Sequence, residues 1–410
     1  MTLRRTIAAL VLLLATTTGL PARAAGLPPA AQAALDRLLD NARATHSDAV
    51  LVLHDGKPIG DYRRDGAPSG PIELMSATKS VVALGIGQLL ANGRIRSLDQ
   101  PVADFYPEWR QGRKADITVR MLLDHTSGLQ NVPMAPKEIH PAPDVIQLAL
   151  AAELDGAPGE AFSYNNKAVN LLAGIIDRAA GQPMDAFFRD GLFKAMDIRP
   201  GPWEKDRAGH PYAMSGLPLT AADAAKIGQL VLDRGRWEGR QLVPVDYIDA
   251  MLAAGPKHAG CGLLWWRRPA WTKIRVVDDA ATRMRDKGVV DEVAAKFEPL
   301  QGGTFDSEAA FLDAISGVFG HSAAEAWNLQ IKPKIAPAGF MDSQDGPVVA
   351  FEAEGYLGQY IEVVPGARLV AVRQIADSDD YLPEWGYTTF RDDVVALAQA
   401  LQPTLAEDAP

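Results

Sequence analysis

A serine and a lysine three residues apart are the residues of this chain best suited to nucleophilic chemistry. The stretch Met75–Ser80 reads Met-Ser-Ala-Thr-Lys-Ser and precedes an apolar run, which predicts the start of a buried helix. Residues i and i+3 share one helix face, so the Ser76 hydroxyl and the Lys79 amine are expected side by side. Burial lowers the pKa of a lysine, which can then take the serine proton and activate the nucleophile. The alternative is a helix-capping serine followed by a solvated lysine.

Strand patterns occur at both ends of the chain and predict the sheet that would carry this helix. Near the N-terminus two apolar runs flank Asp55-Gly56, a strong hairpin signal. Near the C-terminus two strand-like runs are joined by Pro365-Gly366. We expect one antiparallel sheet built from both ends of the chain, with a helical region inserted between them. The expected strands are 49–54, 57–62, 261–266, 356–364 and 368–375.

Helical patterns fill the middle of the chain and divide it into regions. An α/β sheet domain is predicted from residues 25–75, 205–275 and 339–410, and a mostly helical domain from 76–204. Residues 276–338 are rich in charge and alanine and are predicted to form an inserted helical subdomain, which would act as a lid or wall over the site. Expected helices are 28–44, 76–92, 144–154, 168–180, 184–196, 219–233, 243–254, 291–297, 307–318, 322–327 and 394–401.

The N-terminus has the pattern of an export signal. Arg4 and Arg5 precede a short apolar run over 7–14, and Ala22-Arg23-Ala24 matches a cleavage site, which predicts a signal peptide over 1–24. The run is too short to span a membrane, so no stable membrane insertion is expected after its removal. The mature protein is expected to be periplasmic or secreted. Cys261, the only cysteine, is predicted to be a buried structural residue rather than a thiol nucleophile.

Composition limits the classes of partner. With 410 residues, one large domain or two closely packed domains are expected. The net charge is −10 and no dense Lys/Arg stripe occurs, so nucleic acid is not expected as a partner. The seven histidines are scattered without ligand-like spacing, so neither a metal nor another cofactor is predicted.

Three stretches in sequence order carry a resemblance to a known family. They are Ser76-Ala77-Thr78-Lys79, the segment 122–129 (Leu-Leu-Asp-His-Thr-Ser-Gly-Leu), and the segment 158–164, which leads into Tyr164-Asn165-Asn166. The chain resembles the serine β-lactamase-like superfamily from about residue 48 to 401, leaving out 276–338. The resemblance implies an α/β fold of the α+β type, with an antiparallel sheet flanked by helices and a mostly helical domain. For His125 and Ser127 we expect local hydrogen bonding rather than a catalytic pair.

The resemblance also implies roles for individual residues. Ser76 would be acylated, while Lys79 and Tyr164 would move its proton, with a nearby ammonium favouring the tyrosine phenolate. Asn166 would hold Lys79 or a substrate amide. The oxyanion would lie between the backbone N–H groups of Ser76 and Tyr356.

The third motif of the family departs from its usual form. Lys-Thr-Gly or His-x-Gly is expected there, whereas this chain has Gly355-Tyr356-Leu357-Gly358-Gln359, which is similar to the esterase and 6-aminohexanoate-dimer-hydrolase-like members. A basic residue at this place meets the carboxylate of a β-lactam or peptidyl-D-Ala substrate, so its absence argues against both unless Arg373 or another cation substitutes. Gly355 is expected to let the backbone approach the substrate, and Gly358 either does the same or marks a strand bulge.

These observations predict a secreted or periplasmic serine hydrolase that cleaves an ester or amide bond through an acyl-enzyme on Ser76. Its partner would be a small-molecule ester, amide or peptide-like substrate. The alternatives are a β-lactamase or DD-peptidase, and a non-catalytic binding relative. The sequence leaves the oligomeric state open.

Overall fold

The computed structural model describes residues 26–132, 134–320, 335 and 338–402. The predicted signal peptide over 1–24 and the predicted helix over 322–327 lie outside the described residues. Among the described helices, none combines the length and the apolar character needed to cross a membrane.

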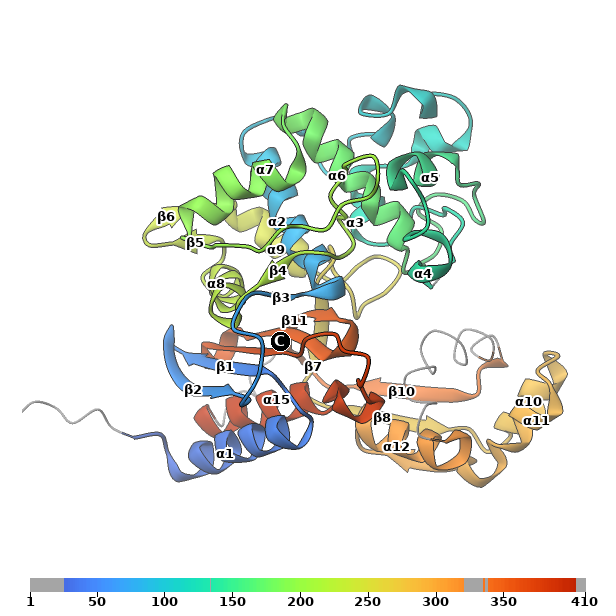
Figure 1. The fold of residues 1–410 in the computed structure, drawn as a ribbon. Coiled ribbons are helices and arrows are strands. Elements are labelled where there is room, and N and C mark those ends of the chain that lie inside the picture. The colour runs from blue at the N-terminus through green and yellow to red at the C-terminus, as the bar shows by residue number, and fades with distance from the viewer. Residues whose placement is uncertain (1–25, 133, 321–334, 336–337, 403–410) are drawn as a thin grey trace, which may run out of the picture.

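The described residues form a six-stranded antiparallel sheet that joins the two ends of the chain, in the order β2-β1-β13-β12-β11-β7 (Figure 1). The N-terminal hairpin pairs with the C-terminal strand β13, with Val50 opposite Arg373. The turn residues Asp55 and Gly56 both have positive φ (48° and 71°), as the tight hairpin turn requires. The sheet predicted from both ends of the chain is therefore confirmed. The strands are β1 Ala49–His54, β2 Lys57–Arg63, β7 Trp266–Pro269, β11 Val348–Gly355, β12 Gln359–Val364 and β13 Leu369–Gln374.

Two strand predictions near the site were wrong in their limits, and β11 was not predicted. The strand expected over 261–266 begins only at Trp266, because Leu264 has a φ of 60° and the Gly262 N–H donates to the Trp265 carbonyl across a tight turn. Residues 356–358 form the turn between β11 and β12 rather than strand. Two glutamates, the buried Glu352 and the half-buried Glu354, interrupt the apolar residues of β11, so this strand does not show an apolar pattern in the sequence.

Helices cover both faces of the sheet. The helices α1 (Pro29–Ala44) and α15 (Phe390–Leu401) pack against one face, and α8 (Ala221–Leu232) packs against the other (Figure 1). The second face continues into the helical region, and its core includes sheet residues such as Ile361 and Val372 together with the helices. The sheet and the helical region thus share one apolar core at the place where the site forms.

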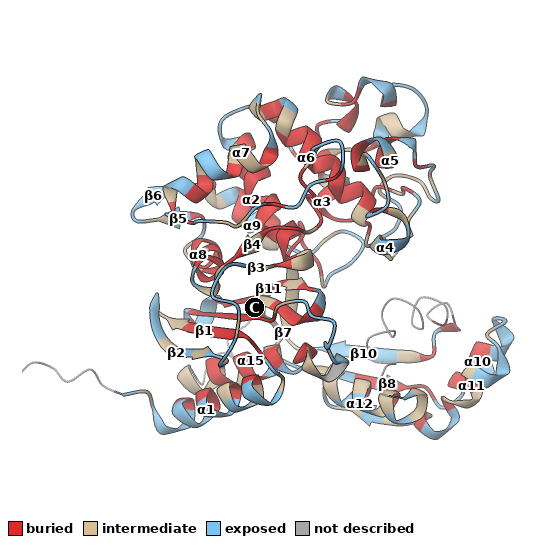
Figure 2. Cartoon of the chain, viewed as in Figure 1, coloured by how far each residue is buried: buried red, intermediate tan, exposed pale blue. Residues whose placement is uncertain are grey.

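The helical region is built around α2, which is buried at nearly every position (Figure 2). Gly181, with a φ of 74°, ends α6 as predicted. The predicted helix over 184–196 consists of α7 followed by a π-helical turn, Arg189–Phe193. The helices are α2 Thr78–Ala91, α3 Val119–Leu123, α4 Ala135–Glu138, α5 Val145–Ala151, α6 Asn166–Ala180, α7 Met184–Phe188 and α9 Val245–Leu252. Two short antiparallel strand pairs also occur. In one, β3 Ile72–Glu73 pairs with β4 Pro218–Leu219, and in the other, β5 Arg236–Trp237 pairs with β6 Arg240–Gln241.

The inserted segment has a core of its own and is not purely helical. Its sheet has three strands, of which only Thr304–Phe305 lies within the predicted 276–338, since Thr272–Val276 and Met341–Asp345 stand at or beyond those limits. This corrects both the limits and the purely helical content that were predicted. The strands at 304–305 and 341–345 are short or polar and show no apolar alternation in the sequence, whereas Thr272–Val276 has a brief one, with Ile274 and Val276 buried. This unit projects beyond the β7 edge of the main sheet (Figure 1). Its elements are β8 Thr272–Val276, α10 Ala280–Asp286, α11 Asp291–Ala295, β9 Thr304–Phe305, α12 Glu308–Phe319 and β10 Met341–Asp345.

Candidate active site

Ser76 lies on a single 3₁₀ turn, Met75–Ala77, that leads directly into α2. The Lys79 Nζ lies 2.9 Å from the Ser76 Oγ, so the predicted pair is formed. Ser76 is half-buried, whereas Lys79 is only 3% exposed. Met75 has a φ of 49°, an uncommon conformation for a residue with a side chain, and it turns the chain just before the serine. The helix-cap and solvated-lysine alternative therefore does not describe this pair.

The Lys79 amine is also held in place by a backbone carbonyl. Its Nζ donates to the Met214 carbonyl at 2.7 Å, and burial lowers its pKa well below the ordinary lysine value, which favours the neutral amine. The Met214 N–H in turn donates to the Oδ1 of Asn170 at 3.1 Å. Asn170 is fully buried on α6, and sequence reasoning missed it, although a polar residue within an apolar run was a usable signal.

Tyr164 approaches the same pair from the loop before α6. Its hydroxyl forms a hydrogen bond with the Ser76 side chain, and its ring centroid lies 5.1 Å from the Lys79 Nζ. Burial raises the pKa of the Tyr164 phenol, and the hydrogen bond to Ser76 only partly opposes this. The expected phenolate is therefore not supported. The site favours a neutral amine beside a protonated phenol, because burial disfavours the charged form of both groups.

His125 fixes the backbone on both sides of Tyr164. Its carbonyl accepts from the Ser163 N–H at 2.8 Å, and its Nδ1 accepts from the Asn165 N–H at 3.1 Å. Burial lowers the pKa of His125 to about 3, so the imidazole stays neutral and its Nδ1 remains an acceptor. A hydrogen-bonding role for His125 is thus observed, but its partners lie in the loop before α6 and not nearby in the chain. The predicted local bond is made by Ser127, whose Oγ accepts from the Leu129 N–H at 3.4 Å.

The two asparagines after Tyr164 have different surroundings. Asn165 caps α6 by accepting from the Ala168 N–H at 2.9 Å. Asn166 is the first residue of α6, and its buried Oδ1 has no hydrogen-bond partner among the described residues. The amine of Lys79 bonds to Ser76 and to the Met214 carbonyl rather than to Asn166. A role for Asn166 toward a substrate amide stays a prediction.

The third motif places the end of β11 against the 3₁₀ turn Met75–Ala77, which carries Ser76 and is called the nucleophile turn below. Any side chain at position 355 would overlap the Leu74 carbonyl oxygen, so glycine is required for this close approach. The Gly355–Tyr356 peptide thus lies beside the turn that carries Ser76, as the predicted oxyanion site needs. Gly358 lies in the turn between β11 and β12 with a φ of 83° and packs against the Gly386 carbonyl, so it is a turn residue and not a strand bulge.

Arg373 cannot replace the missing basic residue of the motif. It is fully buried, and its guanidinium donates to the carbonyls of Leu357 and Gly358 at 2.6 and 2.8 Å and to the Ser47 hydroxyl at 2.8 Å. Its hydrogen bonds fix the β11–β12 turn from the interior of the sheet. The possibility that Arg373 contacts a substrate carboxylate is therefore excluded by its position.

A narrow pocket opens at this group. Ser76, Lys79, His125 and Tyr164 line it together with Ser80, Cys261, Leu264, Trp266 and Glu354. Trp266 and Glu354 were not predicted as site residues, because they come from β7 and β11, whose limits the sequence did not give. Cys261 is buried, and burial raises the pKa of its thiol to about 12, which matches the structural role predicted for it. No described residue of 276–338 lines the pocket, so the described part of the insertion does not form the predicted wall.

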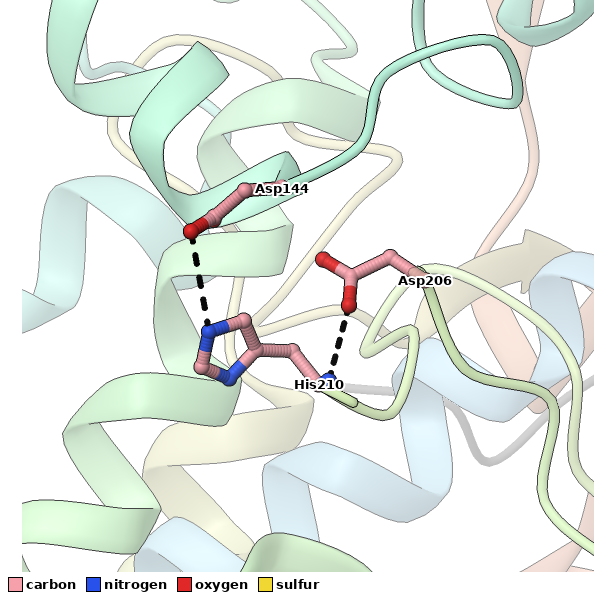
Figure 3. Close-up of side chains that lie close together, drawn as sticks. All are labelled: Asp144, Asp206 and His210. Carbon is pink, nitrogen blue, oxygen red and sulfur yellow. Dashed lines mark hydrogen bonds and ion pairs between the residues drawn. The ribbon is translucent and has the colours of Figure 1, made fainter. Parts of the chain in front are cut away.

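A second cluster of polar side chains holds a loop against α5 (Figure 3). The carboxylate of Asp206 accepts from the Val145 N–H at 2.9 Å and from the His210 N–H at 2.8 Å. The imidazole Nε2 of His210 lies 3.9 Å from Asp144, which is the N-cap of α5. These bonds account for the cluster as a brace between the loop and the helix.

Comparison with known proteins places this geometry in a family. The beta-lactamase family model matches residues 35–260, more than half of the chain. The chain belongs to the beta-lactamase family. It is 28% identical over 235 residues to a 6-aminohexanoate-dimer hydrolase of Paenarthrobacter ureafaciens, covering 52% of this chain and 59% of that protein. It is also 28% identical over 196 residues to esterase EstB of Burkholderia gladioli, covering 40% of this chain and 48% of the esterase. The chain thus spans about half the length of the curated relatives it matches.

Solved structures show the same fold. A protein of Bacillus anthracis that is named as a 6-aminohexanoate-dimer hydrolase superposes with a TM-score of 0.61, over 90% of this chain and 82% of that one, at 18% identity. The predicted fold class, a β-lactamase/transpeptidase-like α/β fold, is thereby confirmed.

Proposed function

We propose that this protein is a serine hydrolase that cleaves an ester or amide bond through an acyl-enzyme on Ser76. The observation that carries the proposal is the contact between the Ser76 Oγ and the buried Lys79 Nζ at 2.9 Å. Burial favours the neutral amine, and a neutral amine at this distance can accept the serine proton. The hydrolase and esterase names of the relatives support the same reaction class.

Lys79 and Tyr164 would have different roles in moving protons during the reaction. As the Ser76 Oγ attacks the substrate carbonyl carbon, its proton passes to the Lys79 Nζ and the carbonyl oxygen becomes an oxyanion. Tyr164, protonated because burial raises its pKa, donates its proton to the leaving oxygen or nitrogen, and the Lys79 ammonium restores the phenol proton. A water molecule then attacks the acyl-enzyme, gives its proton to the same groups, and Ser76 leaves with a proton.

The oxyanion would be stabilised by the Ser76 and Tyr356 N–H groups. Loss of one such donor typically costs about 2.7–4 kcal/mol of transition-state stabilisation. The close approach of Gly355 to the nucleophile turn is consistent with this arrangement.

Esters and linear amides fit the site better than β-lactams or peptidyl-D-Ala substrates. The third motif has no basic residue, and Arg373 donates its hydrogen bonds inside the sheet. A β-lactamase or DD-peptidase activity is therefore the second candidate. We further propose a periplasmic or secreted location, on the signal-like sequence at the N-terminus, to be tested by N-terminal sequencing of the exported protein.

Intact-mass spectrometry after exposure to a fluorophosphonate tests the nucleophile. Wild type should gain one label, and Ser76→Ala should gain none. Ser343→Ala, which removes an exposed serine on β10, is the matched control and should label as wild type does. Turnover of p-nitrophenyl esters without turnover of nitrocefin would favour the esterase over the β-lactamase. Absence of label on folded wild-type protein would contradict the proposal and favour a binding protein.

A further inference from the structure

A carboxylate stands in the pocket where the family motif normally brings a cation. Glu354 immediately precedes Gly355 at the end of β11 and lines the pocket together with Ser76 and Tyr164. Burial raises the pKa of Glu354, and the neighbouring Arg268 guanidinium opposes this shift and favours the carboxylate. The charge of this carboxylate in turn contributes to raising the pKa of the Tyr164 phenol. Glu354 is therefore near enough to the reacting groups to act on a bound substrate.

Arg268 on β7 pairs with this carboxylate but does not hide it. The Arg268 Nη2 lies 2.6 Å from the Glu354 Oε2, while its Nε donates to the Oε1 of Glu352 at 2.8 Å. The side chain of Arg268 is 14% exposed and that of Glu354 is 40% exposed. A molecule that enters from solvent therefore meets the carboxylate before the guanidinium.

The charges around the pocket leave an excess of negative charge. Arg268 is shared by two carboxylates, and Arg391, the next cation, pairs with Glu308 at 3.3 Å. Glu362 is fully buried opposite Glu352, and burial raises its pKa well above the usual range, so it stays protonated and adds no charge. Among the residues around Ser76, burial lowers the pKa of Lys79 and of His125 and so favours their neutral forms.

Aromatic faces complete the surroundings of Glu354. The rings of Trp266 and Tyr164 stack with centroids 6.1 Å apart, and both residues line the pocket. The Arg268 guanidinium already lies over the Trp266 ring, 5.6 Å from its centroid. Tyr356, which follows Glu354 by two residues, is 54% exposed. Aromatic faces attract cations, most strongly when a carboxylate is close by, and they offer nothing comparable to an anion.

We propose that Glu354, with the neighbouring aromatic rings, selects substrates that carry a positively charged ammonium group close to the scissile ester or amide bond. This inference rests on the proposed hydrolase function and names the substrate class of the same site. Substrates with a carboxylate at this place are disfavoured, because Glu354 repels them and Arg268 is already held by two carboxylates.

Two esters of equal shape and different charge test the proposal. Acetylcholine carries a quaternary ammonium group, and 3,3-dimethylbutyl acetate is its neutral isostere; the acetate ester of 3-hydroxypropionate supplies the anionic case. Hydrolysis is followed in a pH-stat at low ionic strength. We expect kcat/KM to be about tenfold higher for the cationic ester than for the neutral one, the size of one ion pair combined with a cation–π contact. Added salt should reduce this ratio.

Two variants test whether Glu354 causes the preference for a cationic substrate. Glu354→Gln should reduce the ratio of cationic to neutral kcat/KM from about tenfold to about threefold, since it removes the ion pair and leaves the aromatic rings in place. Glu308→Gln changes a carboxylate of the same charge cluster that does not line the pocket, and it should keep the wild-type ratio. Thermal unfolding of both variants verifies that each is folded.

The outcomes separate this inference from the hydrolase proposal. Equal or faster hydrolysis of the neutral or the anionic ester by wild type would overturn the inference while leaving the hydrolase proposal intact. An unchanged ratio in folded Glu354→Gln would do the same. If the fluorophosphonate does not label Ser76 and none of the three esters is cleaved, the hydrolase proposal fails and the substrate class fails with it.

Discussion

Gly355→Ala is a test of how closely β11 and the nucleophile turn are fitted together. The added methyl group would overlap the Leu74 carbonyl oxygen and would lie 3.1 Å from both the Met75 Cβ and the Gln359 Cβ. Gly355 itself has an ordinary extended conformation (φ −134°), so the effect of the substitution comes from this overlap and not from backbone strain. To restore a normal van der Waals distance, strand and turn must separate by about 1 Å.

The size of the effect follows from that displacement. A misplacement of about 1 Å in an active site can cost roughly 10²-fold in rate, and overpacking a tight site typically costs about 1–3 kcal/mol of stability. We therefore expect kcat/KM for a p-nitrophenyl ester, and the rate of fluorophosphonate labelling, to fall about 100-fold. The free energy of unfolding should decrease by about 1–3 kcal/mol, the loss that overpacking typically causes.

Urea unfolding and labelling kinetics are measured on the same preparations. Gly317→Ala is the matched control, because a Cβ at this α12 position meets no atom within 4 Å and the residue lies in a helix. It should leave the labelling rate unchanged and should not destabilise the protein, since alanine favours helix. Wild-type labelling and stability in Gly355→Ala would refute the reasoning that β11 and the Ser76 turn are in close contact.

Two further substitutions probe the residues that position Lys79 and Tyr164. In Asn170→Ala the Met214 N–H loses its hydrogen-bond acceptor in the core. We therefore expect urea unfolding to show a loss of about 1–3 kcal/mol in stability, and the fluorophosphonate to label Ser76 more slowly. An unchanged labelling rate would contradict the role of Asn170. His125 has a folded pKa of about 3 against about 6.5 in the unfolded chain, so between these values only the unfolded state binds its proton, and wild-type stability should fall as pH drops from 6.5. His125→Asn keeps an acceptor that does not titrate and should lose part of this pH dependence, as measured by urea midpoints at pH 7 and 4.5; equal slopes in the two proteins would show that His125 does not contribute.

The nucleophile, its base and the tyrosine could be predicted because their chemistry needs fixed residue types at short or recognisable spacings. Ser76 and Lys79 lie within one turn, and Tyr164 follows a stretch with a characteristic sequence. The sheet could be predicted because both hairpins have strong turn residues. Each of these signals depends on residues that are close together in the chain, so it can be recognised in a single sequence.

The missed residues act over long separations in the chain. Lys79 is held by the carbonyl of Met214, and a backbone carbonyl leaves no mark in the sequence. Glu354 and Trp266 reach the pocket only because β7 and β11 pair at one edge of the sheet. The expected phenolate of Tyr164 is not supported, because the sequence did not reveal how deeply Lys79 and Tyr164 would be buried.

The pairing of β7 with β11 also has a consequence for the way the inserted unit is joined to the main sheet. Pro269 and Val348 lie opposite each other in the sheet, and the Ala270 N–H donates to the Pro347 carbonyl at 2.8 Å. The chain therefore leaves the main sheet and returns to it at a single point, so that residues 270–347 are, in topological terms, one very long hairpin loop. Loop length adds little to the entropy of closing such a connection, and hairpin tips are common sites of tolerated insertion. A short turn joining Pro269 to Val348 would leave the ladder of the main sheet complete, but it would also remove Glu308, the ion-pair partner of Arg391 on α15.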